Sequence, residues 1–175
     1  MLLLAGPLWG RSFPDSFDGY FRYSSERFLQ RDWRQLKAQG WQESRLNPDA
    51  RSHAGAMGVM QFMPRTWTEC TLALGLNVSP YNPKASIICG GWYMQRMGRM
   101  WDRRGRTDDQ VWHLALASYN AGPGSILKAQ KRCYDVPMWP EISECLYLIT
   151  GFDNSTETIR YVVLIPQIYY RMQQN

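Results

Sequence analysis

Apolar residues recur every three or four positions along most of this chain, and almost no segment alternates between apolar and polar residues. The first spacing is that of a helix with one buried face, whereas strict alternation would indicate a half-buried strand. The sequence therefore predicts an all-α fold. With 175 residues, of which 45% are hydrophobic and 20% charged, the chain has the length of one domain and the composition of a folded protein.

Helix-breaking residues divide this pattern into segments. A first helical region is predicted from Ser25 to Ser44, ended by Asn47-Pro48, and residues 49–63, rich in glycine and other small residues, are expected to form an irregular loop. Further helices are predicted from Pro64 to Gly75, after Asn82-Pro83, after a capping box of Thr107 and Gln110, and from about Thr156 with a kink at Pro166. Residues 1–24 are assigned to an N-terminal segment that packs on the domain or leads into it, and residues 25–175 to the domain itself.

The first nine residues are apolar but lack the basic region that precedes the apolar part of a cleavable secretory signal. They are interpreted either as the remnant of a leader or as an apolar segment that packs on the domain. No stretch of the sequence approaches the roughly 20 apolar residues that span a bilayer. No transmembrane segment is therefore expected.

The four cysteines form no C-x-x-C pair, and the only histidines are His53 and His113. This pattern argues against a metal site, and no cofactor is expected. In an oxidising compartment two disulfides would be natural, most simply Cys70–Cys89 and Cys133–Cys145, although three connectivities are possible. Four buried thiols are the alternative.

The chain carries 20 lysines and arginines against 15 acidic residues, which gives a net charge of +5 and a pI near 9.1. This balance favours anionic partners such as nucleic acid, acidic lipid or cell wall. Five arginines between Arg96 and Arg106 form either a basic stripe or an ordinary solvated helix end. No recognised DNA- or RNA-binding motif is present, so nucleic acid is not expected as a partner.

Four short motifs follow one another along the chain. They are Glu43-Ser44 ahead of Asn47-Pro48, the segment from Gly55 to Trp67, the stretch Ser118-Tyr119-Asn120-Ala121-Gly122, and Glu157-Thr158-x-x-Tyr161-Val162. In this order they resemble the motifs of the soluble lytic transglycosylase family. The resemblance implies a single lysozyme-like domain, with the architecture of goose-type lysozymes and lytic transglycosylases, that cleaves bacterial peptidoglycan.

Glu43 is the candidate general acid on its own chemistry. It lies at the C-terminal end of a predicted helix, ahead of a loop that carries Met57, Met60 and Phe62. Burial among such side chains and the negative end of the helix dipole would both raise the pKa of its carboxyl group. A carboxyl that stays protonated near neutral pH can give its proton to a glycosidic oxygen as the bond breaks. A surface glutamate beside Arg45 is the alternative.

Most glycosidases use a second carboxylate as nucleophile or base. The resemblance implies that none is needed here. In this family one glutamate protonates the bond between N-acetylmuramic acid and N-acetylglucosamine, the neighbouring N-acetyl group stabilises the cation, and the same carboxylate then takes the proton of the muramoyl 6-hydroxyl, which leaves a 1,6-anhydromuramoyl end. Asp49 is close to Glu43 in sequence, but no spacing commits it to the site.

The resemblance assigns further residues to the substrate cleft. They are Ser52 as a hydrogen-bond partner of Glu43, Gln61 and Met63 against an N-acetylated sugar, Tyr119 near the catalytic carboxyl, Asn120 in contact with sugar, and Glu157 with Tyr161 as a sugar-binding wall on one helix face. For Ser52 a turn hydroxyl is the alternative, and for Met63 core packing. Gly40 and three polar residues before Glu43, namely Lys37, Gln39 and Gln42, predict a looser or more exposed helix than is usual in the family.

The expected partner is the glycan strand of peptidoglycan, acted on by a monomer in the periplasm or cell wall, whether secreted or delivered by a phage. Two alternatives remain open from the sequence. One is a goose-type lysozyme that hydrolyses the same bond with water. The other is a wall-binding assembly protein that keeps the fold with little turnover.

Overall fold

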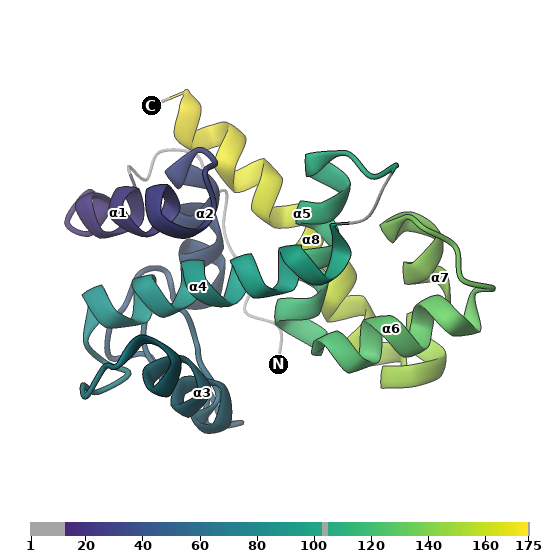
Figure 1. The fold of residues 1–175 in the computed structure, drawn as a ribbon, viewed down its shortest axis with the longest axis horizontal. Coiled ribbons are helices and arrows are strands. Elements are labelled where there is room, and N and C mark those ends of the chain that lie inside the picture. The colour runs from purple at the N-terminus through teal and green to yellow at the C-terminus, as the bar shows by residue number, and fades with distance from the viewer. Residues whose placement is uncertain (1–12, 103–104, 175) are drawn as a thin grey trace.

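The computed structural model describes residues 13–102 and 105–174, and within these ranges the regular structure consists of eight helices with no named strand (Figure 1). They are α1 (Asp18–Phe28), α2 (Trp33–Ser44), α3 (Pro64–Leu74), α4 (Pro83–Trp101), α5 (Asp108–Ala121), α6 (Pro123–Arg132), α7 (Trp139–Thr150) and α8 (Phe152–Gln173). The predicted all-α fold is confirmed. Each of these helices is too short or too polar to span a lipid bilayer.

The helical region predicted from Ser25 to Ser44 is in fact two helices. Gln30 has a φ of 51°, which the α-helix does not allow, and Asp32 then caps α2 by accepting a hydrogen bond from the backbone N–H of Arg34 at 3.0 Å. Because α1 begins at Asp18, the predicted boundary between residues 24 and 25 falls inside it. The apolar segment of residues 1–9 lies outside the described residues.

The C-terminal third of the chain holds two helices that the sequence analysis did not assign, α6 and α7. Proline in the first turn marks the start of each. The last helix begins at Phe152, four residues before the predicted start, and continues through Pro166. The capping box of Thr107 and Gln110 at the start of α5 is present as predicted.

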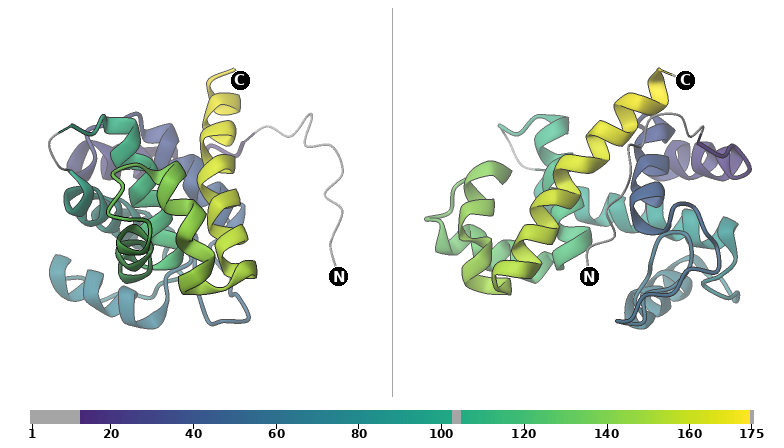
Figure 2. Two further views of the ribbon diagram at one scale, coloured as in Figure 1. Left: turned by 90° about the vertical axis from the view of Figure 1, so that its right-hand side faces the viewer. Right: turned by 180° about the vertical axis from the view of Figure 1, so that it is seen from behind.

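The helices pack around one core. The long helix α4 runs through the middle of the molecule against α1 and α5, whereas α6 and α7 pack together at one end (Figure 1). The right-hand view of Figure 2 shows α8 crossing the back of the molecule diagonally. In this position α8 contacts α2, α5 and α7. The packing brings the end of α2 next to a helix that follows it by more than a hundred residues.

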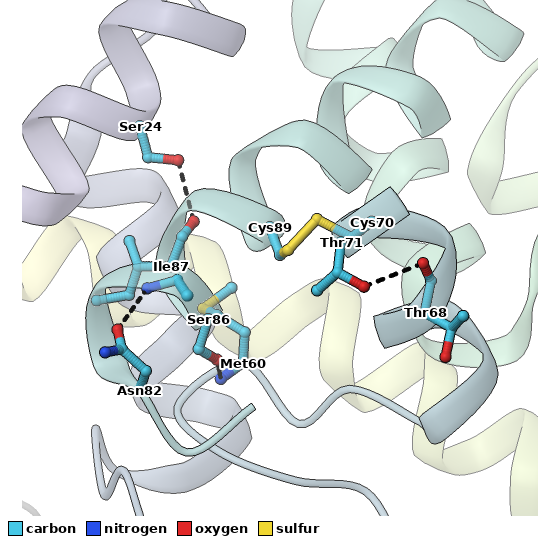
Figure 3. Close-up of a disulfide and its surroundings, with 10 residues drawn as sticks. Ser24, Met60, Thr68, Cys70, Thr71, Asn82, Ser86, Ile87 and Cys89 are labelled. Carbon is cyan, nitrogen blue, oxygen red and sulfur yellow. Dashed lines mark hydrogen bonds between the residues drawn. A yellow bond between two sulfur atoms is a disulfide. The ribbon is translucent and has the colours of Figure 1, made fainter. Parts of the chain in front are cut away.

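The segment between α2 and α3 has no regular structure, as predicted, but it is part of the core. Val59, Met60 and Phe62 are all buried, and a Cβ atom added at Gly40 or Gly90 would meet the Met60 side chain at 3.1 or 2.8 Å. Met60 therefore fills the space between α2 and α4, which both glycines leave open. Its backbone N–H donates to the hydroxyl of Ser86 on α4 at 3.1 Å (Figure 3).

The prediction of a looser or more exposed α2 is wrong. Gln39 is fully buried and Lys37 is 4% exposed. The Lys37 ammonium group forms an ion pair with Asp18 of α1 and lies over the ring of Trp33, which compensates for its burial. Lys37 and Gln39 therefore serve internal contacts rather than solvent, and the third residue, Gln42, is half-buried.

Both expected disulfides are present in the structure. Cys70 of α3 is bonded to Cys89 of α4 (Figure 3), and Cys133 at the end of α6 is bonded to Cys145 of α7. The bridges join residues 19 and 12 positions apart. Each bridge therefore ties together two consecutive helices, so α3 and α6 are held covalently to their neighbours.

We expect reduction to destabilise the folded protein by about 2–4 kcal/mol per bridge, because a crosslink limits the freedom of the unfolded chain. The measurement is urea unfolding of oxidised and reduced protein. Protein made under oxidising conditions should also show no free thiol after denaturation. Four titratable thiols in that material would contradict the prediction.

Candidate active site

An open pocket of about 530 Å³ lies where the end of α2 meets α5 and α8. The pocket has the size of a typical small-ligand site. Ten residues line it, namely Gln42 and Glu43 of α2, Asn120 of α5, and Phe152, Asp153, Thr156, Glu157, Arg160, Tyr161 and Leu164 of α8. One wall is therefore made almost entirely by successive turns of α8, with polar and apolar side chains side by side.

The Glu43 carboxyl group is held by a residue of α8. The buried phenol of Tyr161 donates a hydrogen bond to Glu43 Oε1 at 2.5 Å, and the amide of Gln39 donates to the Tyr161 hydroxyl at 3.0 Å. Gln39 and Glu43 are one turn apart on α2, so both side chains leave the helix on the same side. The expectation that Tyr161 belongs to a sugar-binding wall is thus extended by a direct contact with the carboxyl group.

Enclosure by protein raises the pKa of Glu43 from the ordinary value of 4.5 to about 8. Loss of hydration is the main cause, and the negative charge of Glu157 adds to it, whereas the hydrogen bond from Tyr161 acts in the opposite direction. The apolar enclosure comes from different residues than expected. Met60 and Phe62 are buried in the core, and neither they nor Met57 line the pocket.

We expect the free energy of unfolding to fall as the pH rises from about 4.5 to about 8. In this window Glu43 ionises in the unfolded chain but stays protonated in the folded one, so the unfolded state loses a proton that the folded state keeps. Glu43→Gln should remove this part of the pH dependence. The check is urea unfolding of both proteins at pH 5 and pH 8, and parallel stabilities of the two proteins would contradict it.

Three of the predicted residues surround this carboxyl group. Tyr119 is half-buried, and its hydroxyl donates to the Met60 carbonyl at 2.7 Å. Loss of hydration is the main cause that holds the pKa of its phenol well above the ordinary value, and the nearby Glu43 charge adds to it. Asn120 donates weakly to Glu157 Oε1 at 3.4 Å and accepts from the Thr158 hydroxyl at 2.7 Å. The structure therefore brings Tyr119, Asn120 and Glu157 together with Glu43.

The structure places the other three predicted residues away from the pocket lining. The Ser52 hydroxyl accepts from the backbone N–H of Ala56 at 3.0 Å, which is the turn role, and no described hydrogen bond joins it to Glu43. The Gln61 amide donates to the carbonyls of Ala50 and Gly58, so it braces the loop. Met63 is 45% exposed, which rules out core packing for its side chain.

Several pocket residues were missed by sequence reasoning. Phe152, Asp153 and Arg160 line the pocket from α8. Asp153 lies four residues before Glu157 and Arg160 three residues after it, and this helical spacing was the available signal. Gln39 could have been noticed because it precedes Glu43 by one turn. Asp49, in contrast, does not line the pocket.

The arginine run does not form one stripe in the described part of the chain. Arg96 forms an ion pair with Glu69 of α3 at 2.8 Å, and Arg106 donates to the backbone carbonyls of Pro137 and Trp101. Arg99 is exposed, and residues 103 and 104 lie outside the described ranges. Two of these arginines therefore serve contacts between elements.

Residues 24–142 match the family model of the transglycosylase SLT domain. A protein named membrane-bound lytic murein transglycosylase F from Hahella chejuensis is 29% identical over 167 residues, which cover 87% of this chain and 31% of that protein. A protein of similar name from Alkalilimnicola ehrlichii is 31% identical over 157 residues, with 82% and 30% covered. The chain thus spans about a third of the length of these relatives.

Solved structures with the same fold exist. An inactive mutant of the lytic transglycosylase Slt from Pseudomonas aeruginosa superposes with a TM-score of 0.71 at 24% identity, over 93% of this chain and 25% of that one. The 70-kDa soluble lytic transglycosylase from Escherichia coli gives a TM-score of 0.72 at 22% identity, over 92% and 25%. The chain therefore has the fold of one part of these larger proteins.

Proposed function

Because this chain belongs to the transglycosylase SLT domain family, we propose that it cleaves the glycan strands of bacterial peptidoglycan between N-acetylmuramic acid and N-acetylglucosamine. The observation that carries the proposal is Glu43, a carboxyl group in an open pocket with a pKa of about 8. Such a group is protonated at neutral pH, as a general acid must be before it acts. The names of the relatives support the same substrate.

In the proposed reaction, Glu43 gives its proton to the oxygen that joins the two sugars, and the bond to the muramoyl C1 breaks with an oxocarbenium-like transition state. The N-acetyl group of the same sugar stabilises the cation. The Glu43 carboxylate then accepts the proton of the muramoyl 6-hydroxyl as its oxygen bonds to C1. The products are a 1,6-anhydromuramoyl end and a free N-acetylglucosamine 4-hydroxyl, so the carboxyl group ends the cycle protonated.

This proposal gives Glu43 both the acid and the base role. Glu157 and Asp153 also line the pocket, so either one is available as a base in the alternative reaction, in which water attacks the sugar. Glu157 is contacted by the Asn120 amide, which fits a residue that binds substrate. Asp49 is outside the pocket and is not a candidate for that role.

Product analysis separates the two reactions. We expect mass spectrometry of digested peptidoglycan to give muropeptides lighter by one water than their hydrolysed counterparts, with ends that resist borohydride. Predominantly reducible muramic acid ends would instead identify a hydrolase of the goose-type lysozyme kind and make Glu157 the next residue to mutate. Intact strands after incubation with folded protein would favour the wall-binding alternative.

The remaining assignments are proposals of the same kind. Asn120, Glu157 and Tyr161 would contact or position the sugar at the bond that breaks, while Ser52, Gln61 and Met63 would act through the loop between α2 and α3. The catalytic unit would be the helical domain assigned to residues 25–175, with α1 extending it to Asp18. We propose that it acts as a monomer in the periplasm or cell wall.

A further inference from the structure

Gln39 is a fully buried polar residue that does not line the pocket. Its amide nitrogen donates to the Tyr161 hydroxyl at 3.0 Å, and its amide oxygen is buried without a hydrogen-bond partner among the described residues. An apolar residue would avoid the cost of that unpaired oxygen. The contact with Tyr161 is therefore the one polar interaction that explains an amide at this position.

The contact determines which way the Tyr161 hydroxyl points. A phenol has a single O–H donor, and its oxygen can also accept. Because the Gln39 amide approaches as a donor, the phenol oxygen accepts there and its own proton goes to Glu43 Oε1. Oε1 is then an acceptor whether the carboxyl group is charged or neutral.

We propose that Gln39 is a positioning residue, which through Tyr161 keeps the acid proton of Glu43 on Oε2, the oxygen that can reach substrate. Oε2 has no hydrogen-bond partner among the described residues. The side-chain oxygen and nitrogen atoms there that are both buried and unpaired are Asp18 Oδ1, Ser25 Oγ and Gln39 Oε1, so the unpaired Oε2 is not buried. Glu43 lines the pocket, so Oε2 is open to it. The inference rests on the proposed function for its effect on turnover, but not for its effect on proton position.

Without the Gln39 amide a second arrangement becomes available. The neutral carboxyl group can carry its proton on Oε1 and donate it to the Tyr161 oxygen, which no longer has another donor. In that state the proton faces the protein interior and is not available to a glycosidic oxygen. The neutral carboxyl group of Glu43 is thus stabilised by a second proton position. The charged carboxylate is stabilised less than before, because the Tyr161 hydroxyl is a weaker donor when the Gln39 amide no longer polarises it.

Both changes raise the pKa of Glu43. In the described part of the chain, the other titratable or charged groups around this carboxyl are Glu157, Asp153, Arg160 and Tyr161 of α8 and Tyr119 of α5. We expect these groups to stay in place when Gln39 is replaced. The effect of Gln39 can therefore be measured separately from theirs.

The first arm of the test needs no turnover. Carbon-13 NMR of labelled glutamate side chains, with the Glu43 signal assigned by its loss in Glu43→Gln, gives the Glu43 pKa in each protein. In Gln39→Met, which deletes the donor at similar volume, we expect this pKa to rise by roughly 0.2 to 0.6 pH unit. Gln39→Asn, which keeps an amide but withdraws it from Tyr161, should give a rise of the same sign and provides a second variant if Gln39→Met folds poorly.

Lys37→Met is the matched control. It replaces another buried polar residue of the same helix by the same side chain, but Lys37 contacts Asp18 and Trp33 rather than Tyr161. Its Glu43 pKa should equal that of the unmodified protein. An equal rise in Lys37→Met would show that general loosening of α2 is the cause, and would overturn the proposal.

The decisive comparison is made in a Tyr161→Phe background. If Gln39 acts through the phenol, Gln39→Met should change neither the Glu43 pKa nor the turnover further once the phenol is gone. In the unmodified background Gln39→Met should lower kcat by roughly two- to fourfold, because a pKa rise of about 0.6 leaves a quarter of the neutral carboxyl groups with the proton on Oε2, and KM should change little.

An unchanged Glu43 pKa in both Gln39 variants, or equal effects with and without the Tyr161 hydroxyl, would overturn the inference. Absence of peptidoglycan cleavage by the unmodified protein would overturn the proposed function instead. The NMR comparison would still decide the role of Gln39 in that case.

Discussion

Glu43→Gln is expected to lower the turnover of peptidoglycan by about 10²- to 10⁴-fold while the protein stays folded. The amide keeps the shape of the carboxyl group, and its oxygen can still accept from Tyr161, so the packing of α2 against α8 is retained. It has no acidic proton to give to the leaving oxygen and no basic oxygen to take one back. Both halves of the proposed reaction are lost in a single substitution.

The measurement is release of soluble muropeptides from purified peptidoglycan, with circular dichroism and urea unfolding as checks on the fold. Glu141→Gln, the same change at an exposed site on α7, is the control and should retain full turnover. Near-normal wall clearing by folded Glu43→Gln protein would remove Glu43 from the mechanism.

Gly58→Ala is expected to destabilise the folded protein by about 3 kcal/mol or more. Gly58 has a φ of +74°, in the left-handed region, and a Cβ atom there would lie 2.1 Å from the backbone oxygen of Pro80. The atom that would be met belongs to the main chain, so no side-chain rotation can relieve the clash. The loop between α2 and α3 would have to move away from the segment before α4.

Gly75→Ala separates the clash from the backbone conformation. Gly75 has a similar φ of +64° at the end of α3, but nothing lies within 4 Å of the added Cβ. It should lose only about 1 kcal/mol. Urea unfolding of the two variants tests the difference. Equal losses of unfolding free energy would mean that the clash with Pro80 does not add to the destabilisation.

The sequence predicted those parts of the molecule that local chemistry controls. Helical spacing and the capping box at Thr107 gave the all-α fold, and the motif around Glu43 identified the carboxyl group that the structure encloses. The break between α1 and α2 was missed because it depends on the backbone conformation of Gln30, a residue type with no preference for a left-handed turn.

The candidate site was less predictable, because its partners come from distant parts of the chain. Gln39 was interpreted as a sign of an exposed helix. Only the position of α8 shows that its amide donates a hydrogen bond to the Tyr161 hydroxyl. Ser52 and Gln61 lie in the motif-bearing loop, yet their described hydrogen bonds hold that loop rather than the pocket. A motif records which residues occur together, and not which of them bind substrate and which maintain the loop.

The hydrogen bond from Tyr161 to Glu43 joins residues 118 positions apart, and seven of the ten pocket residues come from α8. The raised pKa of Glu43 therefore depends on a helix that is synthesised more than a hundred residues after Glu43 itself. A nascent chain that has not yet released α8 carries the motif glutamate in contact with water, as an ordinary ionised carboxylate without a proton to donate. Docking of α8 both shields that carboxylate and supplies the pocket wall. On the proposed mechanism, a chain cleaved before α8 should therefore lose turnover although it keeps the motif glutamate.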